Sequence, residues 1–169
     1  MQAKINCAEL GVLDGPLLLF GGPYSNLQAV EALADFAAAR GVGGDQMICT
    51  GDIVAYCGAP SESVAAIRAL GCAVVAGNCE LQLASGAEDC GCGFAPGSSC
   101  DMLSGAWYAH AASQLDAEAK TWMGSLPDVA VFQHQGQRYG VIHGGVRDVA
   151  RFIWSESAGA VFEEEWRAL

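Results

Sequence analysis

The stretch Met47-Ile48-Cys49-Thr50-Gly51-Asp52 is a short apolar run that ends in a polar Gly-Asp pair. Two later stretches, Gly77-Asn78-Cys79 and His143-Gly144, also follow apolar runs that are typical of buried strands. The carboxyl ends of parallel strands meet at one edge of a sheet, so the Asp, Asn and His side chains are expected to converge there. This ligand set suits Mn, Fe or Zn better than Ca or Mg, which prefer oxygen alone. The pattern predicts a hydrolytic metal site.

The segments around the first two stretches alternate between strand and helix patterns. Pro16–Phe20, Gln46–Cys49 and Cys72–Ala76 are short apolar runs bounded by turn residues, as expected of strands in a parallel sheet. Helical spacing of apolar residues occupies 26–41 and 60–71 between them. The order strand, helix, strand, helix, strand predicts right-handed βαβ units and a largely parallel sheet.

The second half of the chain departs from this rhythm. Residues 80–102 are rich in Gly, Ser and Cys, which predicts a long loop or insertion beside the strand ends. Further elements are expected downstream: helices around Trp107, over 117–126 and over 161–169, and a hairpin of strands Val129–His134 and Arg138–His143. We expect one domain that spans residues 1–169.

Composition and charge exclude several classes of protein. Hydrophobic residues make up 52% of the 169 residues and charged residues 16%, so a disordered chain is not expected. A net charge of −11 disfavours binding to nucleic acid and to anionic lipid. No apolar stretch reaches the length of a membrane span, and Met1–Asn6 lacks the features of a signal peptide, so a cytoplasmic location is expected. Oligomeric state does not follow from the sequence.

Four motifs in register resemble the calcineurin-like metallophosphoesterase superfamily, in particular its small bacterial phosphoesterases. The motifs are Tyr24-Ser25-Asn26-Leu27-Gln28-Ala29, Thr50-Gly51-Asp52-Ile53-Val54-Ala55-Tyr56, Val75-Ala76-Gly77-Asn78-Cys79-Glu80 and Val141-Ile142-His143-Gly144. Trp122–Pro127 also resembles the segment before the family's hairpin, and the similarity covers about residues 12–155. The resemblance implies an α/β fold in which a sandwich of two β-sheets is flanked by helices (α/β/β/α), with two metals at the strand ends.

The resemblance also implies roles for individual residues. Asp52 matches the carboxylate that bridges the two metals, and Asn78 and His143 match ligands of the second metal. Asn78 would also orient the phosphate. In the family, the metals polarise phosphoryl oxygens and activate water for in-line attack. The implied function is therefore metal-dependent hydrolysis of a phosphomonoester or phosphodiester, with a small phosphorylated substrate.

The chain departs from the family pattern at its first motif. The family has an Asp and a His as ligands of the first metal where this chain has Gly22 and Tyr24. Glycine has no side chain, and a phenol with a pKa near 10 is a poor ligand at neutral pH. The family's late Gly-His-x-His motif is absent before Leu169, which fits either a shortened version of a longer protein or a remodelled site. The number of bound metal ions, one or two, remains open at this point, and a single-metal site is the natural expectation.

Four cysteines fall within residues 79–100, at or inside the expected insertion: Cys79, Cys90, Cys92 and Cys100. Their spacing does not match the paired C-x2-C pattern of structural zinc sites. Thiolates are nevertheless soft ligands for Zn or an iron–sulfur cluster, and a loop with little core can be held by a metal or a disulfide. A cysteine metal cluster and incidental buried thiols are both open at this point.

Arg147 and Arg151, just beyond His143, are candidates for binding phosphate in a bidentate manner. Three functional hypotheses follow. The first is a metal-dependent phosphoesterase with an altered or single-metal site. The second is a non-catalytic module of the same fold that binds a metal or a phosphorylated ligand. The third is a metal or redox protein centred on the cysteines.

Overall fold

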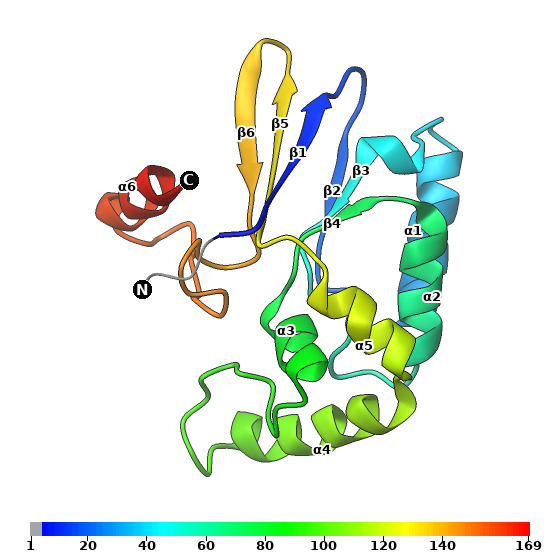
Figure 1. Ribbon diagram of the computed structural model, residues 1–169, viewed down its shortest axis with the longest axis vertical. Coiled ribbons are helices and arrows are strands. Elements are labelled where there is room, and N and C mark those ends of the chain that lie inside the picture. Colours follow the sequence, from blue (N-terminus) through cyan, green and yellow to red (C-terminus); the bar gives the residue numbers. More distant parts are fainter. Residues whose placement is uncertain (1–4) are drawn as a thin grey trace.

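The computed structural model describes residues 5–169 and contains two three-stranded sheets with helices around them (Figure 1). Residues 1–4 lie outside the described part, and so does most of the Met1–Asn6 stretch on which the signal-peptide expectation was based. The first sheet has the order β2-β3-β4, and all its strands are parallel. These strands are Leu18–Phe20, Met47–Cys49 and Ala73–Val74. They are the three expected parallel strands, each shorter than its apolar run.

The second sheet has the order β1-β5-β6 and is mixed. Its strands are β1 (Cys7–Val12), β5 (Val129–His134) and β6 (Gln137–Val141). β1 runs parallel to β5, whereas β5 and β6 form an antiparallel hairpin. The turn at Gln135-Gly136 has positive φ at both residues, the geometry that matches the twist of a two-residue hairpin. The predicted hairpin is therefore confirmed.

Six α-helices cover the sheets: α1 (Leu27–Ala38), α2 (Pro60–Leu70), α3 (Asn78–Ser85), α4 (Ser99–Gln114), α5 (Ala117–Gly124) and α6 (Gly159–Ala168). Local sequence signals explain several ends. The Asn26 side chain accepts the Ala29 N–H at the start of α1, and Asp116 caps α5 by accepting the Ala119 N–H. Gly71 ends α2 in the left-handed conformation, with φ of 67°.

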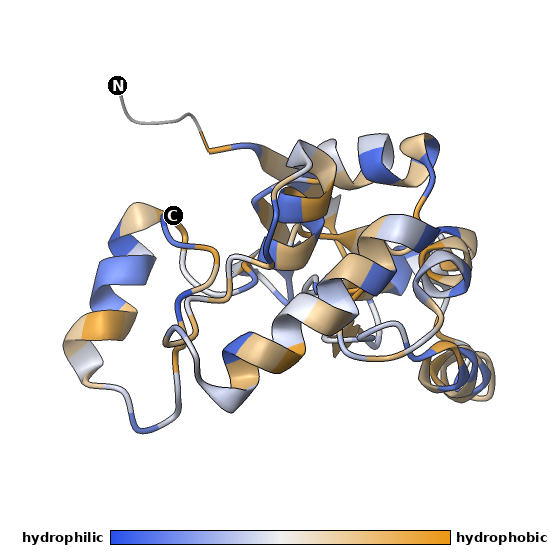
Figure 2. Cartoon of the chain, turned by 90° about the horizontal axis from the view of Figure 1, so that it is seen from below, coloured by the Kyte–Doolittle hydropathy of each residue, from blue (hydrophilic) through white to orange (hydrophobic). Residues whose placement is uncertain are grey.

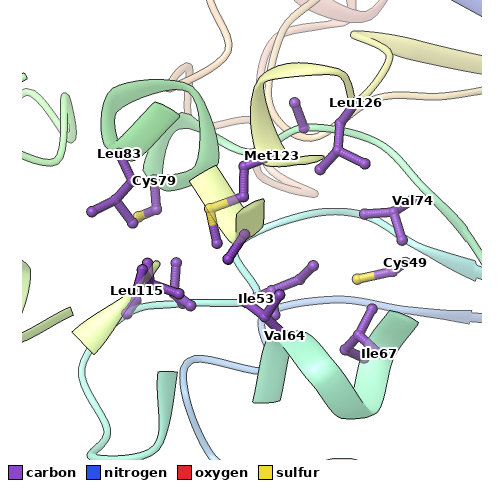
Figure 3. Close-up of a cluster of buried hydrophobic side chains, with 14 of the residues drawn as sticks. Cys49, Ile53, Val64, Ile67, Val74, Cys79, Leu83, Leu115, Met123 and Leu126 are labelled. Carbon is purple, nitrogen blue, oxygen red and sulfur yellow. The ribbon is translucent and has the colours of Figure 1, made fainter. Parts of the chain in front are cut away.

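Two hydrophobic clusters hold the layers together. Ile48 and Val75 meet Ala130, Phe132 and Val141 between the two sheets. A larger cluster joins the β2-β3-β4 sheet to helices α1 to α5 on its other face (Figure 3); it includes Cys49, Val64, Ile67, Val74, Leu83 and Met123. This arrangement confirms the predicted β-sandwich flanked by helices.

Helix α6 stands apart from the other helices, beside β6 (Figure 1). Polar and apolar residues interleave along it (Figure 2). Its last residue, Leu169, lies against Gly140 of β6, and Trp166 and Tyr139 line the shallow hollow between helix and sheet. None of the helices in residues 5–169 is long and apolar enough to span a membrane.

Two sequence predictions need correction. The strand β1 was not anticipated, because most of its residues are exposed and it is held by pairing with β5, more than a hundred residues away in the chain. The loop expected over 80–102 is shorter than predicted: α3 runs to Ser85 and α4 starts at Ser99, so the loop occupies 86–98. Burial of Cys79 and Leu83 against the core stabilises α3 despite its weak sequence signal.

Replacement of Ile67 by Ala tests the packing of the larger cluster. Ile67 is fully buried, so Ile67→Ala should lower the free energy of unfolding by about 2–5 kcal/mol through lost burial and a new cavity. Urea denaturation followed by circular dichroism measures the change. The control is Leu103→Ala on α4, where 68% exposure predicts a change within about 0.5 kcal/mol. Equal effects of the two substitutions would contradict this core.

Candidate functional site

Three loops bring Asp52, Asn78 and His143 to one cavity of about 250 Å³. Asp52 follows β3, Asn78 is the first residue of α3, and His143 lies two residues beyond the end of β6. The Asp52 and His143 side chains are only 13% and 17% exposed, and Asn78 is buried. Arg151 lines the same cavity. The three polar residues therefore meet at a common cavity, but they come from two sheets and not from one sheet edge, since His143 follows the antiparallel strand β6.

The His143 ring is held in an orientation that leaves one nitrogen available. Its Nδ1 lies 2.6 Å from the Thr50 carbonyl oxygen, so Nδ1 carries the proton and donates it there. Its Nε2 lies 3.5 Å from Oδ2 of Asp52. Burial lowers the pKa of His143, but the Asp52 carboxylate, the Thr50 carbonyl and the Glu80 charge together raise it by more, so the net shift is upward. In the neutral ring, the Nε2 lone pair faces the Asp52 side of the cavity.

The Asn78 side chain is oriented by the loop that follows α3. Its amide nitrogen donates to the Cys90 carbonyl oxygen at 2.8 Å and contacts the Cys92 sulfur at 3.3 Å. Both contacts use the nitrogen, and among the described residues no donor is placed on the amide oxygen. That oxygen is therefore the end of the side chain left for a ligand in the cavity.

Glu80 ties the Asp52 loop to the start of α3. Its carboxylate is fully buried and accepts the N–H groups of Asp52, Ile53 and Gly77 at 2.8 Å each, with a longer contact to Val54 N at 3.4 Å. Burial and the nearby Asp52 charge raise the pKa of Glu80 to about 7, while the backbone donors oppose that rise. The sequence analysis did not single out Glu80. The Gly77-x-x-Glu80 spacing, half of a capping box, is the signal that could have found it.

The close approach of the Asp52 loop to the start of α3 also needs glycine at position 77. A Cβ there would collide with the Asp52 carboxylate and backbone. The Asp52 carboxylate also lies 3.4 Å from the Cys79 N–H at the start of α3. Close backbone approach therefore lets the helix N-terminus meet the carboxylate that the sequence predicted as a ligand.

The comparison with protein families agrees with this geometry. Residues 16–168 match the sequence profile of the family described as calcineurin-like phosphoesterase. The chain belongs to the calcineurin-like phosphoesterase family. The predicted resemblance is thereby confirmed. Members of this family generally use divalent metals. No curated protein sequence matches the chain.

Two solved structures share the fold of this phosphoesterase-family chain. A metallophosphoesterase from Sphaerobacter thermophilus is 23% identical, with a TM-score of 0.63 over 92% of this chain and 57% of its own. A hypothetical protein from Pyrococcus horikoshii OT3 is 17% identical, with a TM-score of 0.67 over 92% of this chain and 65% of its own. The chain thus spans about three fifths of the length of these two structures.

The first-motif positions of the family are filled by an aromatic ring. The Tyr24 side chain folds over Gly22, and a Cβ at Gly22 would collide with that ring. Burial and the Asp52 charge raise the pKa of Tyr24 further above its ordinary value, so the phenol stays neutral at neutral pH. Position 22 can therefore carry no ligand side chain while the Tyr24 ring occupies this space.

The spacing of Asp52 and His143 can be compared with that of two ligands on one metal ion. Two ligands of one tetrahedral metal, with bonds of about 2.0–2.2 Å, lie about 3.4 Å apart. The Asp52–His143 separation of 3.5 Å is long for a hydrogen bond but matches this spacing. Within residues 5–169, no three His, Cys, Asp or Glu side chains are grouped to hold a metal.

The cysteines do not form the cluster that their spacing left open. Cys90 and Cys92 are joined by a disulfide, Cys79 is buried as a free thiol, and Cys100 is exposed at the start of α4. Burial raises the pKa of Cys79, which disfavours a thiolate there. The expectation of a four-cysteine metal site is therefore corrected, whereas a redox role for the cysteines stays a prediction.

The structure separates the two candidate arginines. Arg147 is exposed and lines a different hollow, beside α6. Arg151 lines both hollows, and its guanidinium is paired with Glu165 at 2.7 Å and Glu164 at 3.0 Å. The structure therefore places Arg151, and not Arg147, at the cavity of Asp52 and His143, while phosphate binding by either arginine stays a prediction.

Removal of the Glu80 carboxylate tests its role in holding the loops. Glu80→Ala leaves buried backbone N–H groups without acceptors and should lower the free energy of unfolding by at least about 3 kcal/mol. Urea denaturation measures the change. The control is Glu62→Ala in the first turn of α2, which should cost well under about 1 kcal/mol. A Glu80→Ala protein as stable as wild type would show that the carboxylate does not stabilise the contact between the Asp52 loop and the start of α3.

Proposed function

We propose that this chain is a metal-dependent phosphoesterase that hydrolyses a small phosphomonoester or phosphodiester with one divalent transition metal, Mn, Fe or Zn. The observation that carries the proposal is the 3.5 Å approach of His143 Nε2 to Asp52 Oδ2 in the cavity that Asn78 also lines. Membership of the phosphoesterase family supports the reaction class.

Each residue has a distinct role in this proposal. Asp52 and His143 hold the ion through Oδ2 and Nε2, and the Thr50 carbonyl keeps the proton of His143 on Nδ1. The Asn78 amide oxygen completes the protein ligands and lies where a phosphoryl group would also meet it. When bound, the metal supplies Lewis-acid polarisation of the phosphoryl group and an activated water.

Arg151 supplies the positive charge that an acidic protein otherwise lacks near this cavity. Its pairing with Glu164 and Glu165 restrains the guanidinium, so that a phosphate meets a pre-oriented group. The two paired carboxylates more than neutralise the charge of Arg151, which favours a substrate of modest charge over a polyphosphate. Small phosphorylated substrates are therefore proposed as the partners.

An activity assay on paired variants tests the proposal. Generic phosphomonoester and phosphodiester substrates are offered with Mn, Fe or Zn to wild type and Asp52→Asn. Loss of the ligand charge should reduce turnover by about a hundredfold or more. The matched control is Asp35→Asn on the exposed face of α1, which should keep wild-type turnover. The proposal would be refuted if wild type showed no turnover with any of the metals, or if wild type and Asp52→Asn showed equal turnover.

The second candidate function is a non-catalytic module that binds a metal or a phosphorylated ligand. The observation that favours it is the Tyr24 ring over Gly22, because this contact removes the ligands of the family's first metal. Wild type that binds one ion per chain by elemental analysis, yet turns over no phosphoester, would support this candidate over the enzyme.

Restoration of the first-motif ligands separates these two candidates further. Gly22→Asp alone should destabilise the protein, because the new side chain collides with the Tyr24 ring and Gly22 has φ of 59°. Gly22→Asp combined with Tyr24→His removes the ring and should bind a second metal ion, measured by elemental analysis after gel filtration. Thermal unfolding checks the single variant. A stable Gly22→Asp protein, or a double variant with no additional ion, would contradict this account of the first motif.

A further inference from the structure

A row of aromatic rings runs from the core to the candidate site. The ring centroids of Tyr24 and Tyr56 are 5.1 Å apart, those of Tyr56 and Trp107 are 5.1 Å apart, and those of Trp107 and Tyr108 are 6.0 Å apart. All three pairs meet edge to face. Tyr108 anchors the row, since it is buried and its hydroxyl donates to the Ala87 carbonyl oxygen.

The outer end of this row forms one wall of the cavity. Tyr24 and Tyr56 are 39% and 54% exposed, and both line the cavity that holds Asp52 and His143. Phe94 and Phe152 line it from two other segments. The cavity is therefore divided between polar ligands and apolar rings, which is the usual division in a site for a small organic molecule.

The two tyrosines are held there against their backbone preferences. Tyr24 has φ of 54° and Tyr56 φ of 40°, and such angles are rare for bulky residues. Hydrogen bonds between the loops enforce them: Tyr24 N–H donates to the Asp52 carbonyl, and Cys57 N–H donates to the Tyr24 carbonyl, both at 3.1 Å. Strained conformations of this kind persist where the surrounding structure requires the side chains in place.

We propose that the Tyr24–Tyr56 wall binds a flat aromatic group carried by the phosphoester substrate. The proposal rests on the proposed function for the position of the phosphoryl group at Asp52, Asn78 and His143. The aromatic group, either a nucleobase or a simple aryl ring, then lies against the rings while the phosphoryl group meets the polar residues. A cavity of about 250 Å³ admits a phosphoryl group with one ring system more readily than a large ligand.

Two substrates that differ only in aromaticity test the wall. Benzyl phosphate and cyclohexylmethyl phosphate both release a primary alcohol, so their intrinsic reactivity is similar. Wild type with its best metal should show kcat/KM about tenfold higher for benzyl phosphate. Tyr56→Leu should reduce this preference to less than about twofold, whereas Tyr56→Phe, which keeps the ring, should retain it. Tyr139→Leu on β6 is the matched control, because Tyr139 is similarly exposed but lines other hollows.

A binding experiment distinguishes the two sources of the aromatic group. Calorimetric titration compares adenosine 5′-monophosphate with ribose 5-phosphate, and the benzyl with the cyclohexylmethyl compound. Tighter binding of the adenosine compound identifies a nucleobase, and a preference in the benzyl pair alone identifies a simple aryl ring. Equal binding within both pairs, or a preference that Tyr56→Leu leaves intact, overturns the proposal. A binding preference without turnover in any metal supports the wall and overturns the proposed hydrolysis instead.

Discussion

The buried carboxylate of Glu80 is the interaction on which the site depends. It accepts N–H groups from the Asp52 loop and from Gly77 at the start of α3, and so joins the two segments that carry Asp52 and Asn78. Burial and the Asp52 charge oppose its ionisation, and the backbone donors favour it. A cation held by Asp52 would offset the repulsion between the two carboxylates, so metal binding and the packing of this crossing are physically coupled.

The second constraint is that the aromatic ring of Tyr24 occupies the place where the family's first motif has metal ligands. With Tyr24 over Gly22, position 22 has no room for a side chain, and the same ring forms part of the cavity wall. The combination of Gly22 and Tyr24 therefore has two effects. It limits the candidate protein ligands to Asp52, His143 and Asn78, and it makes one side of the cavity aromatic. The proposed single-metal chemistry and the proposed aromatic substrate follow from the same contact.

Local signals in the sequence predicted much of the fold. Asn26, Gly71 and Asp116 act at helix ends as expected, because capping depends on residues only a few positions apart. The strand β1 and the helix α3 were missed for the opposite reason. β1 is held by hydrogen bonds to β5, and α3 by burial of its apolar face, and both depend on partners distant in the chain.

By itself, the sequence determined the family, the order of the strands and helices other than β1 and α3, and the residue types that reach the strand ends, because these follow from periodicity and short motifs. Only the tertiary structure decided which of those residues meet. It brought Asp52 and His143 to 3.5 Å, turned Arg147 away in favour of Arg151, paired Cys90 with Cys92, and placed Tyr24 over Gly22. These outcomes depend on where loops from two different sheets cross, and the distance between crossing loops is set by packing across the whole fold.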